Sequence, residues 1–290
     1  MKVCSKRAFM TIEELQAKAN EIRQDIIKML LEARSGHSAG PLGMADVFTA
    51  LYFGGVMTYN PKNPSWDERD RLILSNGHIC PVLYATLAHA GYFPHEELMT
   101  LRKLGSRLQG HPERERLPGI ETTSGPLGSG LAQAAGYAYA ARMDSKKFRV
   151  FCITSDAEHQ EGNHWEAVAF AAKYNLSNLT VLVDRNNIQI SGFTEDVMPL
   201  EPLKAKYEAF NWSVLEVDGH NIEAITDSIN MAKAIHENPV VIICRTIPGK
   251  GVPFMENLPE WHGKPPDVRE AIKALSELRT LGGKIVSEHE

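Results

Sequence analysis

The sequence predicts an α/β fold, a doubly wound and mainly parallel sheet with helices on both faces. Three β-branched, apolar runs support this, at 148–154 (FRVFCIT), 179–184 (LTVLVD) and 240–244 (VVIIC). Continuous apolar runs are typical of parallel strands that are covered on both faces. Helical patterns between the runs complete the strand–helix alternation of this class. One of them consists of Ile222, Ile225, Ile229, Ala232 and Ile235.

The N-terminal third is expected to be less regular than the rest. Thr11 and Glu14 have the spacing of a capping box, which marks the start of a helix. Apolar residues then recur in steps of three and four, which predicts a helix with one buried stripe. The stripe consists of Ile12, Leu15, Ala19, Ile22, Ile26, Leu30 and Ala33.

Further elements follow in chain order. We expect a loop at 35–43 (SGHSAGPLG), a helix at 44–55, a short strand at 71–75 and a helix directly after it. A Gly-rich turn at 124–130 precedes a helix of small residues. The sequence contains neither an internal repeat nor a low-complexity linker, so one domain is predicted over 1–290. Its last part, 267–290, is expected to be a terminal helix and tail.

Composition limits the possible functions. The 290 residues are 43% hydrophobic and 23% charged, with a net charge of −5 and no block of Lys or Arg. Binding to nucleic acid or to a membrane surface is therefore not expected. No apolar run approaches the ~20 residues of a membrane span. The four cysteines lie far apart without metal-binding spacing, and Cys152 and Cys244 lie in apolar runs, which fits a reducing cytoplasm.

Polar side chains follow two of the predicted strands. Asp156 comes directly after the first run, and Asp184 and Asn186 lie at the end of the second. In open parallel sheets, ligands bind beyond the carboxyl ends of the strands. Carboxylate and amide oxygens with a nearby backbone carbonyl suit Mg²⁺ or Ca²⁺ bound together with phosphate. The alternative is that Asp156 caps the next helix and Asn186 makes a turn.

The segment SDAEHQEGNHWEAVAFAAKYNLSNLTVLVDRNNIQISG (155–192) resembles the thiamin diphosphate motif of transketolases. That motif begins with Gly-Asp-Gly and ends near an Asn about thirty residues later, as Asp156 and Asn186 do here. The resemblance covers nearly the whole chain in order. It includes SGHSAGPLGMAD (35–46), RDRLILSNGH (69–78), GHPE (110–113), SGPLGSGLAQAAG (124–136) and RTIPGKG (245–251).

The resemblance implies a cofactor site. Asp156, Asn186 and the carbonyl of Ile188 would hold Mg²⁺ or Ca²⁺, which would bridge the phosphates of thiamin diphosphate. Gly125 and Leu127 would belong to the turn that faces the cofactor. Ala157 replaces the usual glycine, so a positive φ there would cost about 1 kcal/mol of strain.

The resemblance also assigns roles to other polar residues. His78 and His262 would face the diphosphate or the reacting centre, while His37 and His111 would line the substrate channel. Glu161 and Glu166 match family carboxylates at the contact between subunits. His159 and His164 match no family role, and we expect them to be solvated or at an interface.

A transketolase chain is more than twice this length, so the resemblance implies an N-terminal, diphosphate-binding subunit. It would act only with a C-terminal subunit that binds the cofactor's pyrimidine, most simply as a heterotetramer. Together they would move a two-carbon ketol unit from a ketose (phosphate) to an aldose (phosphate), as in the pentose phosphate pathway. One alternative is an enzyme similar to dihydroxyacetone synthase or acting on non-phosphorylated sugars. Another is a non-catalytic module that binds metal and diphosphate and regulates a full-length transketolase.

Overall fold

The computed structural model of the chain describes residues 10–280 and contains a five-stranded parallel sheet in the order β1-β2-β3-β7-β6. Each of the three apolar runs forms a central strand, and the predicted strand at 71–75 forms an edge, so the fold class is confirmed. The strands are β1 (Arg71–Leu74), β2 (Val150–Ser155), β3 (Leu179–Arg185), β6 (Ser213–Asp218) and β7 (Val240–Arg245).

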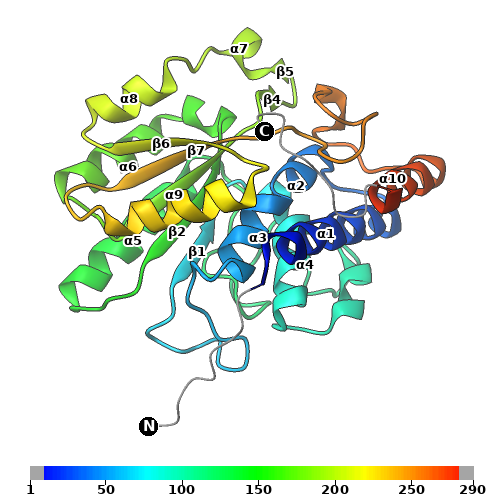
Figure 1. The fold of residues 1–290 in the computed structure, drawn as a ribbon, viewed down its shortest axis with the longest axis horizontal. Helices are drawn as coiled ribbons and strands as arrows, with labels where there is room; N and C mark the ends of the chain where they lie inside the picture. The colour runs from blue at the N-terminus through cyan, green and yellow to red at the C-terminus, as the bar shows by residue number, and fades with distance from the viewer. Residues whose placement is uncertain (1–9, 281–290) are drawn as a thin grey trace.

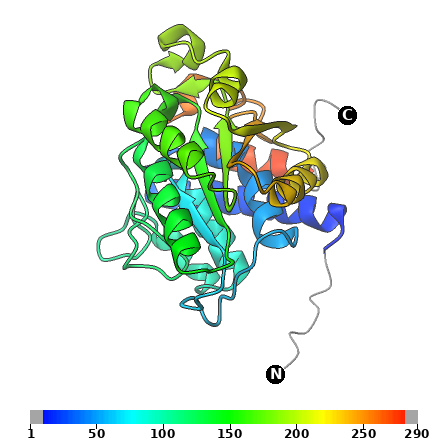
Figure 2. The same ribbon diagram turned by 90° about the vertical axis from the view of Figure 1, so that its left-hand side faces the viewer.

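Helices cover both faces of this sheet (Figures 1 and 2). One face packs against α1 (Ile12–Ala33), α3 (Ala45–Phe53), α4 (Cys80–Ala90) and α9 (Ile222–Ala234), and α10 (Val268–Thr280) joins this layer through α1. The opposite face packs against α5 (Ser129–Met143), α6 (Gly162–Lys173) and α8 (Leu203–Ala209).

Alternate residues of the central strands enter different cores. In β2, Phe151 and Ile153 pack with the α1 layer, whereas Val150 and Cys152 pack with the α5 layer. Successive side chains of a strand point to opposite faces, so a strand between two helical layers must be apolar at nearly every position. This explains the continuous apolar runs in the sequence.

The predicted N-terminal helix forms with the expected cap. In α1 the Thr11 hydroxyl accepts from the backbone N–H of Glu14, and the Glu14 carboxylate accepts from the N–H of Thr11. The predicted loop at 35–43 is wrong in part, because Ala39–Gly43 forms a helical turn, α2. The expected terminal helix is α10, and residues 281–290 lie outside the described part.

Strand β6 is absent from the sequence prediction. It is an edge strand with mostly half-exposed residues, including the exposed Glu216. Such a strand lacks the continuous apolar run that identified the others.

The parallel arrangement brings all five carboxyl ends to one edge of the sheet. The segments that follow the strands meet there, among them η1 (Gly77–Ile79), η3 (Ala157–Gln160), the β4–β5 hairpin (Ile188–Gln189 and Gly192–Phe193) and α7 (Thr194–Val197). The remaining short helices are η2 (His95–Thr100) and η4 (Pro259–Trp261). We call this edge the carboxyl edge.

The structure can be compared with the sequence-based expectations about membrane-spanning helices and about the cysteines. Within residues 10–280, none of the helices combines the length and apolar character that crossing a lipid bilayer requires. Cys80, Cys152 and Cys244 are buried free thiols, as expected for the latter two.

Candidate active site

Asp156 and Asn186 directly follow two neighbouring strands, β2 and β3, at the carboxyl edge. Strands β2 and β3 pair in parallel, with Ser155 opposite Asp184, so Asp156 follows one strand beside the end of the other. The backbone N–H of Asp156 donates to the carbonyl of Asp184 at 3.1 Å. The two strand ends are therefore direct neighbours in the structure.

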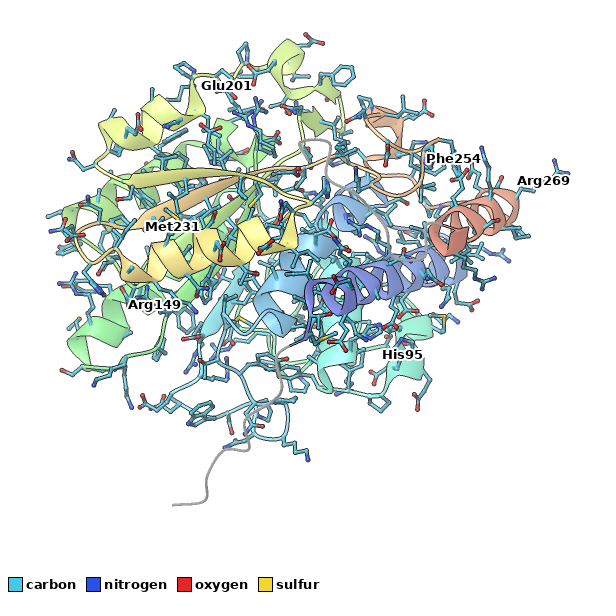
Figure 3. All side chains as sticks on the ribbon, in the orientation of Figure 1. His95, Arg149, Glu201, Met231, Phe254 and Arg269 are labelled. Atoms are coloured by element: carbon cyan, nitrogen blue, oxygen red, sulfur yellow. The ribbon has the colours of Figure 1, made fainter. Side chains whose placement is uncertain are left out.

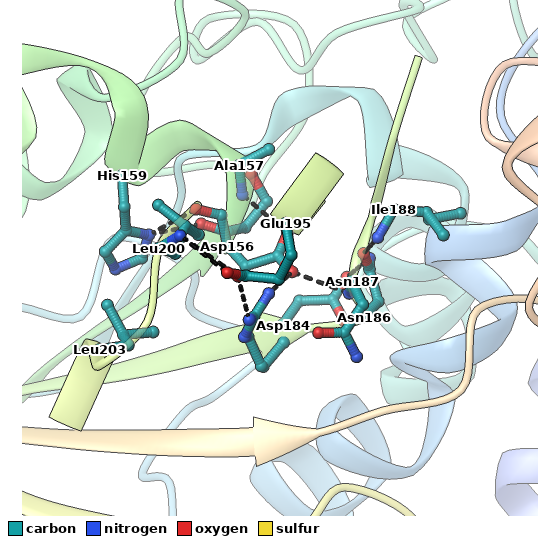
Figure 4. A network of polar contacts seen from close by, with 12 residues as sticks. Asp156, Ala157, His159, Asp184, Asn186, Asn187, Ile188, Glu195, Leu200 and Leu203 are labelled. Atoms are coloured by element: carbon teal, nitrogen blue, oxygen red, sulfur yellow. Dashed lines mark hydrogen bonds and ion pairs between the residues drawn. The ribbon is translucent and has the colours of Figure 1, made fainter. Parts of the chain in front are cut away.

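The Asp156 carboxylate is fully buried and accepts three hydrogen bonds (Figure 4). Oδ1 accepts from the N–H of Ala157 at 2.7 Å, and Oδ2 accepts from the N–H of Asn187 at 2.8 Å. Arg185 donates to Oδ2 through Nη1 at 2.9 Å. Burial raises the pKa of Asp156, an effect that Arg185 and the two backbone donors oppose.

Arg185 joins Asp156 to two further carboxylates. Its Nη2 atom donates to Glu195 at 2.6 Å and to Glu201 at 3.0 Å. One guanidinium and three carboxylates give this group a formal charge of +1 − 3 = −2. A net charge of −2 suits a divalent cation at the free side of Asp156.

Asn186 is held by a second set of contacts. Its Oδ1 accepts from the N–H of Ile188 at 3.0 Å, and its Nδ2 donates to Asp184 Oδ2 at 2.9 Å. Asp184 is buried and also accepts from the Thr246 hydroxyl, while burial raises the pKa of Asp184 to about 7. This network ties the ends of β3 and β7 together.

The oxygen donors fit a divalent cation. A carboxylate offers about four acceptor positions, of which three are used at Asp156, and an amide oxygen offers two, of which the Ile188 N–H uses one. The local contacts of the alternative interpretation are also present, since Asp156 caps η3 and Asn186 forms an Asx turn. These contacts leave lone pairs available, so they do not compete with metal binding.

Ala157 has a right-handed backbone conformation. It begins the 3₁₀ turn η3, and it is not one of the residues with positive φ. Alanine in place of glycine therefore causes no left-handed strain. Its N–H bonds Asp156 and helps to orient the carboxylate.

Three of the four predicted histidines form a cluster. The ring centroids of His37, His78 and His262 lie 5.0 to 5.4 Å apart. They come from the loop after α1, the turn after β1 and the residue after η4. The Ser38 hydroxyl donates to the Lys264 carbonyl at 2.6 Å, which joins two of these loops. We call these residues the histidine trio.

His111 lies near the trio beside the Gly-rich turn. A Cβ on Gly125 would lie 3.7 Å from the His111 ring, and the φ of Gly125 is +147°. The backbone of this turn therefore lies against His111 in a conformation that side chains rarely adopt. Leu127 is half-buried in the same turn.

The surroundings of these histidines favour neutral imidazoles. Burial, with smaller effects of His262 and Arg102, lowers the pKa of His37 to about 4. Burial also lowers the pKa of His78, His111 and His262. A neutral imidazole has one free ring nitrogen, which can accept a hydrogen bond or a proton as a general base does.

A pH dependence of stability follows from His37. Its folded-state pKa of about 4 lies below the ordinary 6.5, so between these values the unfolded chain binds more protons than the folded chain. This contribution to stability is present above pH 6.5 and is lost as the pH falls toward 4. The free energy of unfolding of His37→Gln should therefore fall by about 2 kcal/mol less than that of the wild type when the pH is lowered from 7.5 to 4.5. Urea denaturation at both pH values measures this difference, and equal losses would contradict it.

Buried polar atoms without partners lie in the same loops. Asn76 is fully buried after β1, and neither its amide nitrogen nor its amide oxygen has a hydrogen-bond partner. Ser124 Oγ and His37 Nδ1 are also buried without partners. A Cβ on Gly77 would lie 2.4 Å from Ser124 Oγ, so Ser124 contacts the turn that carries His78. Buried groups of this kind usually bond a ligand or water.

The expectation that His159 and His164 are solvated is wrong. Both are buried, and the Nε2 atom of each lies 2.8 Å from the Tyr207 hydroxyl. His159 Nδ1 donates to the Ser155 carbonyl at 2.9 Å, so its Nε2 accepts from Tyr207, which in turn accepts from His164. Burial lowers the pKa of His159 to about 4, consistent with this neutral form. The two histidines support the turn that carries Asp156.

A family model described as the transketolase thiamine diphosphate binding domain matches residues 15–280. The chain belongs to the transketolase family. It is 43% identical over 243 residues to a 6-deoxy-6-sulfo-D-fructose transketolase subunit of Clostridium sp. (strain MSTE9), covering 84% of this chain and 88% of that protein. It is 38% identical over 280 residues to an apulose-4-phosphate transketolase subunit of Phocaeicola vulgatus, covering 97% and 99%.

Solved transketolases have the same fold. The transketolase of Campylobacter jejuni superposes with a TM-score of 0.88 and 35% identity, over 93% of this chain and 43% of that chain. The chain thus spans less than half of this solved transketolase. The sequence-based identification as a subunit of a transketolase-type enzyme is confirmed.

The sequence interpretation missed several residues of the candidate site. Arg185 pairs with Asp156 and also with Glu195 and Glu201. The Thr246 hydroxyl donates to Asp184. The side chain of Asn76, in the segment 69–78 that resembles the family, has no hydrogen-bond partner. Glu158, to which the sequence assigns no role, is fully buried, and burial raises its pKa to about 7. Asn76 and Arg185 had a signal in the sequence, because each is a polar residue directly after a predicted strand.

Glu161 and Glu166 are exposed, unlike the other predicted site residues of their segment. Glu161 precedes α6, and Glu166 lies on its outer side. A Cβ on Gly128 would lie 2.7 Å from Glu161 Cβ, so Glu161 contacts the Gly-rich turn. Both carboxylates are accessible to a partner chain.

Proposed function

We propose that the chain is the diphosphate-binding subunit of a thiamin diphosphate-dependent transketolase. In this proposal it transfers a two-carbon ketol unit from a ketose, or its phosphate, to an aldose, or its phosphate. One observation carries the proposal: unpartnered buried polar atoms of Asn76, Ser124 and His37 lie in loops at the same carboxyl edge as the oxygen donors of Asp156 and Asn186. The three cysteines within residues 10–280 are buried free thiols, which fits a cytoplasmic enzyme.

Asp156, Asn186 and the carbonyl of Ile188 would hold Mg²⁺ or Ca²⁺, and the ion would bind the diphosphate. The −2 charge of the group around Arg185 favours a dication at Asp156, and two backbone donors fix the orientation of the carboxylate. Gly125 and Leu127 would contribute the turn that faces the cofactor, with Gly125 allowing close approach of the backbone.

Thiamin diphosphate, when bound, supplies the carbanion stabilisation needed to break the carbon–carbon bond beside a carbonyl. The chain's own contribution would be proton transfer at the sugar hydroxyls. His37 and His262 are neutral, half-buried imidazoles on adjoining loops, so each can accept a proton and return it. His78 and His111 would orient the diphosphate and the substrate.

His262→Ala should lower kcat of the assembled enzyme by at least about 100-fold, the lower end of a general acid–base contribution. His262 is half-buried and lies at the end of a short loop turn, so the melting temperature should change little. Steady-state kinetics and thermal melts on the same preparations test this, with His236→Ala at an exposed position as the control. Full activity of His262→Ala would remove the proposed role.

A partner surface is proposed on the outer side of α5 and α6. Helix α5 consists mostly of Ala, Gly and Tyr, and its exposed positions include Ala132, Gly136 and Ala140. The neighbouring α6 exposes Glu166 and Phe170. A helix that is apolar on all sides is normally covered on all sides. Glu161 and Glu166 would then meet the partner chains beside the cofactor.

The missing half of the site would come from a second protein that binds the cofactor's pyrimidine. Two relatives that this chain matches over most of their length are themselves called subunits, while the solved transketolase is more than twice as long. Two copies of each protein make the simplest assembly. Light scattering of the chain, alone and mixed with its partner, measures this stoichiometry.

The donor sugar is best sought among ketoses related to those of the relatives. The two relatives are named for 6-deoxy-6-sulfo-D-fructose and for apulose 4-phosphate, so a donor with an anionic group is a reasonable first test. The mixture should be assayed with sulfonated, phosphorylated and neutral ketoses and a common aldose acceptor. Cofactor binding without transfer from any donor would instead favour the regulatory alternative.

A further inference from the structure

A cluster of one carboxylate and two imidazoles lies in the α1 layer, away from the histidine trio. Asp25 Oδ2, on α1, lies 2.9 Å from Nε2 of His89, near the end of α4. The same oxygen lies 2.6 Å from Nε2 of His95, at the start of η2. Figure 3 labels His95 on the side of the molecule that carries α1 and α4. Within residues 10–280, only this group of three such ligand side chains brings its ligand atoms within 4.8 Å of one another.

We propose that Asp25, His89 and His95 bind one transition-metal dication of the zinc class. Two imidazole nitrogens and one carboxylate oxygen match the ligands of three-residue zinc sites, in which water completes the tetrahedron. Imidazole ligands favour Zn²⁺, Co²⁺ or Ni²⁺ over Mg²⁺ and Ca²⁺, which prefer oxygen. The His95 side chain is 51% exposed, so solvent reaches the fourth position.

The two distances from Asp25 Oδ2 to the imidazole nitrogens would have to lengthen only slightly to accommodate a zinc ion. Ligand atoms of a tetrahedral zinc site lie about 3.3 Å apart, given metal–ligand distances near 2.05 Å. The two N–O distances are 2.9 and 2.6 Å, so the ligands must separate by about half an ångström. The half-exposed His95 can move outward without disturbing the core, whereas Asp25 and His89 are largely buried and preset the site.

The neighbouring charged groups determine the ionisation of Asp25 and the tautomer of His89 when no metal is bound. Burial raises the pKa of Asp25, but hydrogen bonds from His89, His95 and Lys28 lower it well below its usual value, so Asp25 is ionised. The Lys18 ammonium lies 3.3 Å from His89 Nδ1 and can only donate, so that nitrogen accepts and Nε2 carries the proton. Without metal, the cluster is therefore a carboxylate that accepts two N–H groups.

Metal binding requires the other tautomer of His89. Nε2 must release its proton, and the proton on Nδ1 then needs an acceptor in place of Lys18. Glu21 lies one helical turn before Asp25, and its Oε2 is 3.9 Å from His89 Nδ1. In the metal-free state Glu21 pairs with Lys18. On metal binding Lys18 would move away, and the Glu21 carboxylate would accept a hydrogen bond from the Nδ1–H of His89. Lys28 bonds Asp25 Oδ1 and leaves Oδ2 to the metal.

The proposed metal site would join α1 and α4, the two helices next to the loops of His37 and His78. Helix α1 ends at Ala33, shortly before His37, and α4 begins at Cys80, shortly after His78. A metal held by α1, α4 and η2 would fix the packing of these three elements against one another. Its primary effect is on the stability of this layer, so the inference does not depend on the proposed function.

Zn²⁺ titration of the full chain, stripped with a chelator and kept in excess Mg²⁺, tests the proposal. Calorimetry should find one Zn²⁺ site at this cluster, and near-saturating Zn²⁺ should raise the melting temperature by about 5 °C. His95→Gln should weaken binding by at least about 100-fold, while His236→Gln, at another exposed histidine, should not change it. Lys18→Gln should tighten binding several-fold and Glu21→Gln should weaken it.

The histidine trio provides the competing location for the metal. His262→Gln should leave this Zn²⁺ site intact, and Co²⁺ should give the visible spectrum of a four-coordinate ion that disappears in His95→Gln. Unchanged Zn²⁺ affinity in His95→Gln, or loss of the site only in His262→Gln, would overturn the proposal. Absence of any Zn²⁺-dependent stabilisation would identify the cluster as hydrogen-bonded only.

Discussion

Asp156→Ala is expected to abolish Mg²⁺-dependent binding of thiamin diphosphate to the assembled enzyme. The substitution removes the buried carboxylate that we propose as the charged ligand of the dication, from a group with Arg185, Glu195 and Glu201 whose formal charge is −2. Loss of a supporting residue around a bound metal costs 10- to 100-fold in affinity, so loss of the ligand itself should cost at least about 100-fold. Asn186→Ala should act in the same direction. Calorimetric titration of the cofactor, with and without Mg²⁺, measures the effect.

The same variant must be shown to fold. Arg185 keeps Glu195 and Glu201 when Asp156 is replaced, so its charge remains paired and the chain should retain its circular dichroism spectrum. Asp227→Ala, at an exposed position on α9, is the matched control and should bind the cofactor normally. Unchanged cofactor affinity in folded Asp156→Ala and Asn186→Ala would remove the metal site from the account.

The central strands could be predicted because burial on both faces leaves a clear trace in the sequence. Strands β2, β3 and β7 are buried along almost their whole length, so their apolar runs are continuous. Strand β6 lies at the edge and includes the exposed Glu216, so its pattern resembles that of a loop. The pairing of β2 with β3 places Asp156 beside the end of β3.

The supports of the site could not be predicted, because they come from distant or irregular segments. Glu195 and Glu201 reach Arg185 from the segment around α7, where no periodicity marks them as partners. His159 and His164 both lie within hydrogen-bonding distance of the Tyr207 hydroxyl, more than forty residues later in the chain. Such contacts depend on how the α8 segment packs against the sheet, which local patterns do not specify.

The family resemblance supplied what spacing alone could not. Without it, His37, His78 and His262 are three separate histidines in loops, and their convergence becomes visible only in the fold. The cluster of Asp25, His89 and His95 had no such guide. Its members come from two helices and a 3₁₀ turn, and although His89 and His95 are close in the sequence, Asp25 lies 64 residues before His89.

The chain by itself is expected to have no transketolase activity. The chain would supply the ligands of the metal, the turn that faces the diphosphate and four histidines. The remaining contacts to the cofactor and the sugar would lie on the partner. Glu161 and Glu166 are exposed beside the site when no partner is present. Effective catalysis requires all reacting groups to be held in one geometry, so half of the site should give no measurable turnover.

The most direct test measures the initial rate of ketol transfer for the chain alone, for the partner alone and for their mixture. All samples contain Mg²⁺, thiamin diphosphate, a ketose donor and an aldose acceptor, and mass spectrometry verifies that neither preparation contains the other protein. The account predicts transfer only in the mixture, with the rate rising to a plateau at an equimolar ratio. Transfer by the purified chain alone would contradict it.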